Sequence, residues 1–298
     1  MRFKDVTRFA LPALLGIGLV APAGAGPVAA AAFVEAYPGT AAAMRAAGAP
    51  YAGWAATGRR FLTFDPRGDG LAVEVLGDLA TADRIAVLVP GVGSTLRDFD
   101  RGLGGVAHRA PAGQARQVYA EARRIDPDAR VAVLAWLGYD PPDGVLGAAG
   151  ATSARRGATA LRDLLRALAA HRPAATITLI GHSYGSLVVG LAAAQDPARV
   201  TDVVTLGGIG VGVDRADALG GTRRVWAAEA DTDWIRRVPQ LRVPGLGHGR
   251  RPGDPAFGAR PLPAAGVAGH DGYLVSGSPT LTAVAAVLLT GVSVGGSQ

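Results

Sequence analysis

The sequence predicts an α/β fold, in which a mostly parallel β-sheet carries helices on both faces. Short apolar segments that are bounded by turns alternate along the chain with helical segments. The apolar segments are continuously hydrophobic rather than alternating, as expected of strands that are covered on both faces. Repetition of strand, helix and strand favours parallel pairing, and a first strand pair around a tight turn adds an antiparallel edge.

The elements follow one another in a regular order. The first two strands enclose the turn at 65–70, and the helix at 153–171 has a leucine-rich face and ends in cations and a proline. Ser278 is expected to cap the last helix, with Pro279 at its first position. The expected strands are 60–64, 71–76, 85–89, 131–136, 176–180, 203–206 and 224–228, and the expected helices include 153–171, 185–195 and 279–290.

Length and composition fit one large domain. The chain has 298 residues, of which 49% are hydrophobic and 18% are charged, so it can bury a substantial core and is not intrinsically disordered. No internal repeat and no second domain is evident. Cysteine is absent, which excludes disulfides, thiolate metal sites and cysteine nucleophiles.

The charge distribution argues against a nucleic-acid partner. The net charge is +6, but Lys4 is the sole lysine and the arginines are dispersed as short pairs instead of forming a basic stripe. Aromatic residues make up 6% of the chain, too few for a surface that stacks on bases. We therefore expect no nucleic-acid partner.

Residues 1–25 have the organisation of a secretory signal peptide. Three basic residues precede an uncharged run at 9–34 with an apolar centre, and Ala-x-Ala sites end at Ala23 and Ala25. We expect cleavage near Ala25, a secreted or envelope-associated location and no stable membrane span after processing. Asp5 and Pro12 keep two alternatives open, an uncleaved membrane anchor and a leader without a role in export, which would leave the protein cytoplasmic. Residues 26–58 are expected to form an N-terminal extension, and residues 59–298 a single domain.

The segment 181–185 carries the strongest chemical signal. It reads Gly-His-Ser-Tyr-Gly and lies directly between an expected strand and an expected helix. In that context, G-x-S-x-G predicts a nucleophile elbow that presents Ser183 above the sheet, although the motif alone could be a glycine-rich turn. The backbone N–H groups of Tyr184 and Val92 are the expected oxyanion donors, since Val92 follows the strand at 85–89.

A serine nucleophile needs a base and an acid, which are expected in the order Ser, Asp or Glu, His. Two histidines follow Ser183, and His270 is favoured over His248 because it precedes the last helix. Carboxylates follow the strand at 224–228, where Asp233 ranks first and Asp231 second. Each of these residues could instead be an ordinary solvated loop residue.

No cofactor or metal is expected. The segment at 91–95 resembles a phosphate loop but lacks the G-K-[ST] ending, and the glycines at 207–212 lack an acidic ribose partner. The sequence contains no H-E-x-x-H motif and no carboxylate cluster that suggests a metal site.

Six segments together resemble the α/β-hydrolase superfamily, and more narrowly an actinobacterial group of uncharacterised α/β-hydrolases. They are VPGVGSTLRDF at 89–99, AWLGYDP at 135–141, GHSYGS at 181–186, VWA at 225–227, DPAFG at 254–258 and GHDGY at 269–273. The resemblance covers about 59–291 and implies a serine-hydrolase triad at the positions above, but it implies no substrate. The chain differs from longer members because almost no helical region is expected before the hydrolase domain.

The resemblance and the motifs together predict an esterase that works through an acyl-enzyme on a small-molecule or lipid-like ester. An acyltransferase or amidase with the same triad, or a non-catalytic binding module, is the alternative. Only 17 residues separate the strands that end at Leu206 and begin at Arg224, too few for a large lid. We expect the loops at 138–152 and 244–269 to roof the pocket, and short soluble esters to react without a rate jump at an interface.

Overall fold

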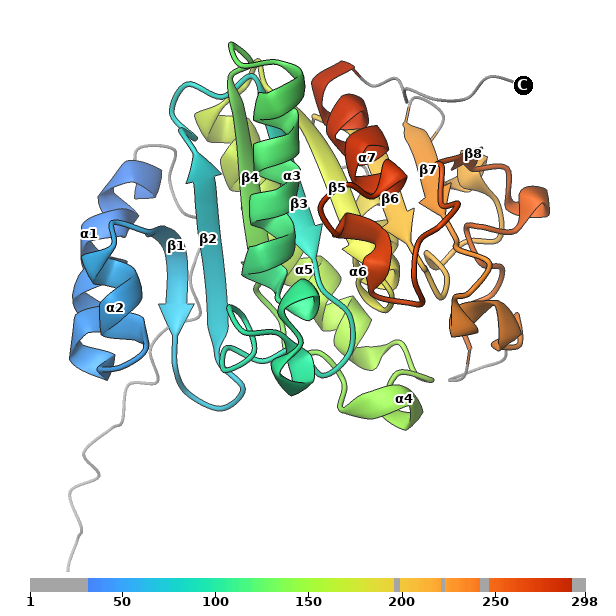
Figure 1. Cartoon of the computed structure of the whole chain (residues 1–298), viewed down its shortest axis with the longest axis horizontal. Coiled ribbons are helices and arrows are strands. Elements are labelled where there is room, and N and C mark those ends of the chain that lie inside the picture. Colours follow the sequence, from blue (N-terminus) through green and yellow to red (C-terminus); the bar gives the residue numbers. More distant parts are fainter. Residues whose placement is uncertain (1–31, 196–198, 221–222, 242–246, 291–298) are drawn as a thin grey trace, which may run out of the picture.

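The computed structural model describes residues 32–195, 199–220, 223–241 and 247–290 (Figure 1). The predicted signal peptide and its cleavage site near Ala25 lie outside the described residues. Within the described ranges, no helix has both the length and the apolar character that are needed to cross a membrane.

One eight-stranded sheet forms the centre of the molecule, and the predicted α/β architecture is confirmed. The strands are ordered β1-β2-β4-β3-β5-β6-β7-β8. β2 pairs antiparallel with both β1 and β4, whereas all other neighbours are parallel. The strand bounds are β1 Arg60–Asp65, β2 Leu71–Gly77, β3 Arg84–Val89, β4 Val131–Leu137, β5 Thr176–His182, β6 Val200–Leu206, β7 Arg224–Ala228 and β8 Arg260–Pro261.

Helices cover the sheet on both faces. α3 (Pro111–Ile125) and α7 (Pro279–Thr290) lie side by side on one face, and α5 (Thr152–His171) and α6 (Gly185–Ala193) lie on the other (Figure 1). Alternate residues of β3 enter the two cores, so that Leu88 packs with α3 and α7 while Val87 packs with α5 and α6. This two-sided burial is the physical reason for the uninterrupted apolar runs in the sequence.

The region before β1 is more helical than the sequence indicates. α1 (Ala32–Ala47) and α2 (Tyr51–Ala56) precede β1, so the expectation of almost no helical structure there was wrong. Met44 and Trp54 are buried in the same core as the sheet, and the Trp54 ring stacks on Phe61 with centroids 5.8 Å apart. Pro38 lies inside α1, and because proline usually interrupts a helix, the sequence does not indicate one here. The domain boundary at residue 59 stays a prediction.

The connection from β6 to β7 is short, as the sequence indicates. It spans 17 residues and includes one 3₁₀ turn, η3 (Ala216–Leu219), so it holds no lid-sized insertion. The short helix α4 (Gly144–Gly147) lies between β4 and α5.

The segment between β3 and α3 is anchored by ions at the edge of the sheet. Arg59 Nε lies 2.6 Å from Oε1 of Glu74, whose side chain is 2% exposed. Asp100, in the segment, lies 3.2 Å from Arg59 and 2.7 Å from Arg116 of α3. Glu74 is buried whereas Asp100 and Arg116 are partly exposed, and the shared contacts tie residue 100 to the start of β1, to β2 and to α3. Two 3₁₀ turns follow, η1 (Leu103–Gly105) and η2 (Ala107–Arg109).

Candidate active site

The strand β5 and the helix α6 hold Ser183 at a sharp turn between them. Ser183 has a φ of 53°, which is rare for a residue with a side chain. Its N–H donates to the carbonyl of Leu206 at 2.9 Å, and α6 begins two residues later. This is the geometry of a nucleophile elbow, in which local strain is stored where a side chain must stand out from the sheet.

Ser183 lines a cavity of about 180 Å³ at the carboxyl ends of the parallel strands. Val89 pairs with Gly181, so the loop after β3 leaves the sheet beside the elbow. A methyl group on Gly91 would lie 2.8 Å from Ser183 Cβ, which shows how close the loop comes. The cavity is lined by three stretches of chain, namely Pro90, Gly91, Val92, Ser94, Leu103, Arg109 and Gln114, then His182 and Ser183, then His270 and Asp271.

The segment that lines one side of the cavity is not one of the two long loops named from the sequence. Residues 103–114, which we call the cavity wall, contribute Leu103, Arg109 and Gln114. Among the described residues, neither 138–152 nor 247–269 contributes a lining residue to this cavity, although the carbonyl of Pro142 accepts a hydrogen bond from Gly93 of the loop after β3. That the two long loops roof the pocket stays a prediction. Length alone does not show where a loop lies, and the cavity wall carries no motif.

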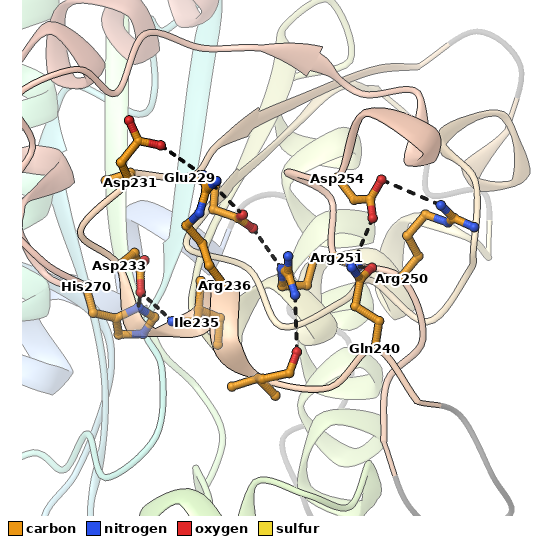
Figure 2. A network of polar contacts seen from close by, with 12 residues as sticks. Glu229, Asp231, Asp233, Ile235, Arg236, Gln240, Arg250, Arg251, Asp254 and His270 are labelled. Carbon is orange, nitrogen blue, oxygen red and sulfur yellow. Dashed lines mark hydrogen bonds and ion pairs between the residues drawn. The ribbon is translucent and has the colours of Figure 1, made fainter.

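Asp233 and His270 are hydrogen bonded to each other (Figure 2). His270 Nδ1 lies 2.8 Å from Oδ1 and 3.0 Å from Oδ2 of Asp233, whose side chain is completely buried. Asp233 also accepts a hydrogen bond from the N–H of Ile235 at 2.9 Å. Because a carboxylate only accepts, Nδ1 carries a hydrogen, and Nε2 is the ring nitrogen that remains to exchange a proton.

Tyr273 is a partner of the acid that the sequence did not reveal as part of the site. Its hydroxyl donates to Asp233 Oδ2 at 2.5 Å and accepts the N–H of Ala230 at 3.0 Å. The only signal in the sequence is its place in the GHDGY segment. The ring of Trp234 packs against that of His270, with centroids 4.7 Å apart.

The surroundings of Asp233 keep it ionised despite its burial. Burial raises the pKa of this carboxyl, but the hydrogen bonds from His270 and Tyr273 outweigh burial and lower the pKa below its ordinary value. Burial and the neighbouring carboxylate raise the pKa of Tyr273, so its hydroxyl keeps its proton as a donor. Gly207 packs directly against the pair, since a methyl group there would lie 2.6 Å from Asp233 Oδ2.

The alternative acid and base occupy other places. Asp231 is 94% exposed and lies 3.1 Å from Arg236, pointing away from His270 (Figure 2). His248 Nε2 donates to the carbonyl of Ala148 at 2.6 Å, and its ring meets the Tyr184 ring edge-on with centroids 6.0 Å apart. His248 does not line the cavity that Ser183 and His270 share.

The expected oxyanion donors flank Ser183. Val92 lines the cavity, and Tyr184 follows the serine at the start of α6. Within the described residues, the N–H groups of Val92 and Tyr184 donate to no other backbone group, whereas the next N–H, that of Gly93, donates to Pro142. The Tyr184 hydroxyl is engaged elsewhere, since it donates to Gly150 at 2.8 Å.

His270 and Ser183 line the same cavity, but no hydrogen bond joins His270 Nε2 to Ser183 Oγ. Nε2 is buried and has no hydrogen-bond partner among the described residues. Catalytic hydrogen bonds are often long in an empty site and shorten when the substrate binds, so this geometry is compatible with a serine and base pair. No group of three or more His, Asp or Glu side chains in the described residues could hold a metal ion.

The chain matches one family model and is similar to several known proteins. A family model described as "Alpha/beta hydrolase" matches residues 65–243. An uncharacterized protein of Mycobacterium tuberculosis is 40% identical over 162 residues, which are 52% of this chain and 58% of that protein. A second uncharacterized protein of this organism is 34% identical over 60% of this chain and 27% of its own length. The chain therefore spans just over half the length of the first relative and about a quarter of the length of the second.

Solved structures with a similar fold are distant in sequence. An α/β serine hydrolase without a lid from Xanthomonas campestris is 16% identical, covers 77% of this chain and 91% of its own, and has a TM-score of 0.39. A carboxylesterase from Mesorhizobium loti is 18% identical, covers 76% and 97%, and has a TM-score of 0.44.

Proposed function

Because the chain belongs to the α/β-hydrolase family, we propose that it hydrolyses carboxylic esters through an acyl-enzyme formed on Ser183. The observation that carries the proposal is the pairing of His270 with the buried Asp233 beside the cavity that Ser183 lines. A buried carboxylate on Nδ1 leaves Nε2 as the base and stabilises the imidazolium that forms when Nε2 takes a proton. No other described histidine combines these features.

The proposed reaction has two halves. Ser183 Oγ attacks the ester carbonyl carbon while His270 Nε2 takes its proton, and the carbonyl oxygen becomes an oxyanion that accepts hydrogen bonds from the N–H groups of Val92 and Tyr184. The C–O bond to the alcohol then breaks, and His270 returns the proton to the leaving alcohol. In the second half, water attacks the acyl-enzyme with His270 again as base, releasing the acid and Ser183.

The volume of the cavity limits the length of the acyl group that it can hold. A volume of about 180 Å³ is small beside the roughly 300–1,000 Å³ of sites that enclose a drug-sized ligand. The cavity wall contributes one aliphatic side chain, Leu103, and two polar ones, Arg109 and Gln114. We therefore propose short acyl groups, and we expect activity toward long-chain, lipid-like esters to be low.

A labelling and substrate series tests this function. The protein should react with a fluorophosphonate at Ser183 and should hydrolyse p-nitrophenyl acetate and butyrate faster than the palmitate. Ser183→Ala is the matched control, and it should abolish both labelling and turnover. Labelling at another serine, or turnover that survives in this variant, would remove Ser183 from the proposal. Preference for palmitate would contradict the short acyl group.

Export remains part of the proposal, on the N-terminal pattern of residues 1–25. N-terminal sequencing of protein from a culture supernatant should find a start near residue 26. An intact Met1 in the cytosolic fraction would contradict it.

A further inference from the structure

His182 is a buried titratable residue that the proposed reaction does not use. It lies next to Ser183 at the end of β5 and is 9% exposed. Its Nε2 lies 2.8 Å from the main-chain carbonyl oxygen of His270, and the two imidazole rings pack with centroids 4.9 Å apart. A carbonyl oxygen only accepts, so Nε2 of His182 carries the hydrogen and donates it.

The groups around His182 act on its charge in opposite directions, and burial outweighs the two nearby carboxylates. His182 Nε2 lies 3.9 Å from Asp271 Oδ1, while Oδ2 of the same carboxylate lies 2.8 Å from Arg109 Nε. The Tyr273 ring is 6.3 Å away, and Asp233 and His270 complete the titratable surroundings. Burial and the adjacent His270 lower the pKa of His182 to about 4, so the ring is neutral at physiological pH.

The loop that carries His270 is held on both sides of that residue, by the ion pair of Asp271 with Arg109 and by hydrogen bonds of Thr232. Gly269 has a φ of 64°, and its N–H donates to Thr232 Oγ1 at 2.9 Å. Asp233 contacts His270 through the ring nitrogen Nδ1 and not through its main chain. The hydrogen bond from His182 acts on the main chain, and it comes from the residue that directly precedes the nucleophile.

We propose that His182 is a positioning residue, whose Nε2–H holds the carbonyl of His270 and so fixes the base relative to Ser183. The elbow thereby presents the nucleophile and also sets the distance to its base. This inference rests on the proposed hydrolase reaction. A misplacement of about 1 Å can cost about 100-fold in rate, so a single tether of this kind can matter to turnover without contacting the substrate.

Two variants of similar size distinguish the effect of the His182 hydrogen-bond donor from the effect of its packing. His182→Leu fills the space without a donor, whereas His182→Gln keeps an N–H at a similar reach. With p-nitrophenyl butyrate, we expect His182→Leu to lower kcat about 10- to 100-fold with KM changed less than about threefold, and His182→Gln to recover most of the loss. Equal activity in the two variants, whether high or low, would overturn the proposal.

A spectroscopic measurement tests the contact without using activity. Nitrogen-15 NMR of the histidine rings should show His182 as the Nε2–H tautomer at pH 7 in the wild-type protein. The Nδ1–H tautomer would overturn the proposal, and this reading remains valid if His182→Leu fails to fold. If wild-type protein neither labels with fluorophosphonate nor turns over esters, the proposed function fails, while the tautomer still reports on the His182 contact.

Discussion

His270 and His248 are two partly buried histidines whose ring nitrogens have the same pattern of hydrogen bonding. Each has one ring nitrogen in a hydrogen bond and one buried nitrogen without a partner among the described residues. They differ in what the bonded nitrogen faces. His270 donates to the carboxylate of Asp233, whereas His248 donates to the neutral carbonyl of Ala148. The carboxylate stabilises a protonated ring, and the carbonyl only orients a neutral one.

The difference shows that burial and a free nitrogen do not make a base. Burial lowers the pKa of His248, because the charged ring would lose solvation and the described residues give it no ionic partner. His248 instead connects two parts of the chain, because it donates to the carbonyl of Ala148 and its ring contacts that of Tyr184, which follows Ser183. The charge of the partner is what distinguishes His270, the proposed base, from His248.

Alanine substitution of each histidine should give the largest contrast. We expect His270→Ala to lower kcat for a short ester about 10⁵- to 10⁶-fold, the scale that is known for triad members of other serine hydrolases. His248→Ala should retain most activity but lose about 1–3 kcal/mol of stability, since the Ala148 carbonyl would lose its donor. Esterase assays and urea unfolding of both variants measure this, and an inactive but folded His248→Ala would exchange the two assignments.

Replacing the carboxylate by an amide should make His270 resemble His248. Asp233→Asn keeps the shape of the side chain but removes its charge and permits the wrong tautomer of His270, so we expect a loss of about 10⁴-fold in kcat. Asp231→Asn is the matched control and should change kcat little, because Asp231 is exposed and paired with Arg236. A larger loss in Asp231→Asn than in Asp233→Asn would make Asp231 the acid.

A smaller effect is expected from displacing the pair while keeping its chemistry. Gly207→Ala would place a methyl group 2.6 Å from Asp233 Oδ2 and 3.0 Å from His270 Nδ1, and we expect about a 100-fold loss in kcat. Gly258→Ala is the control, because that residue also has a positive φ but nothing within 4 Å of an added methyl group. Equal losses in the two variants would show that backbone strain, and not the contact, is responsible.

The smallest expected effect is a change in acid sensitivity. Burial lowers the pKa of His248 in the folded protein below the ordinary value of about 6.5. At pH values below about 6.5 the unfolded chain therefore binds more protons than the folded one, and the protein becomes less stable as the pH is lowered. His248→Gln keeps a donor but does not titrate. The loss of Tm from pH 7 to pH 5 should therefore be smaller in this variant than in wild type, although His182 contributes in the same direction. An unchanged loss would contradict the lowered pKa.

The sheet, the elbow and the pairing of Asp233 with His270 have local signals in the sequence, and the structure shows all three. The continuous apolar run at 85–89 reports burial on both faces, and a serine between a strand and a helix reports an elbow. Asp233 follows its strand within a few residues, and His270 precedes the last helix. The catalytic roles of these residues stay predictions until activity is measured.

The rest depends on contacts between distant parts of the chain. Tyr273 reaches Asp233 only because η6 (Gly272–Leu274) packs beside the loop after β7. The cavity wall meets the histidine loop through Arg109 and Asp271, a pair separated along the chain by most of the sheet. Such pairings have no periodicity and no motif, so a single sequence does not show them.

The ionic anchor at residue 100 has a consequence for how such a protein can diversify. Asp100 fixes the base of the segment to Arg59 and Arg116, while its outer part supplies Leu103 and Arg109 to the cavity. Residues 103–108 can therefore be exchanged without disturbing the strands that hold the serine or the loops that hold its partners. Arg109 is the limit of that freedom, because any replacement must also satisfy Asp271. If the proposed function holds, selection acting on this one short stretch would change substrate preference and leave Ser183, Asp233 and His270 unchanged.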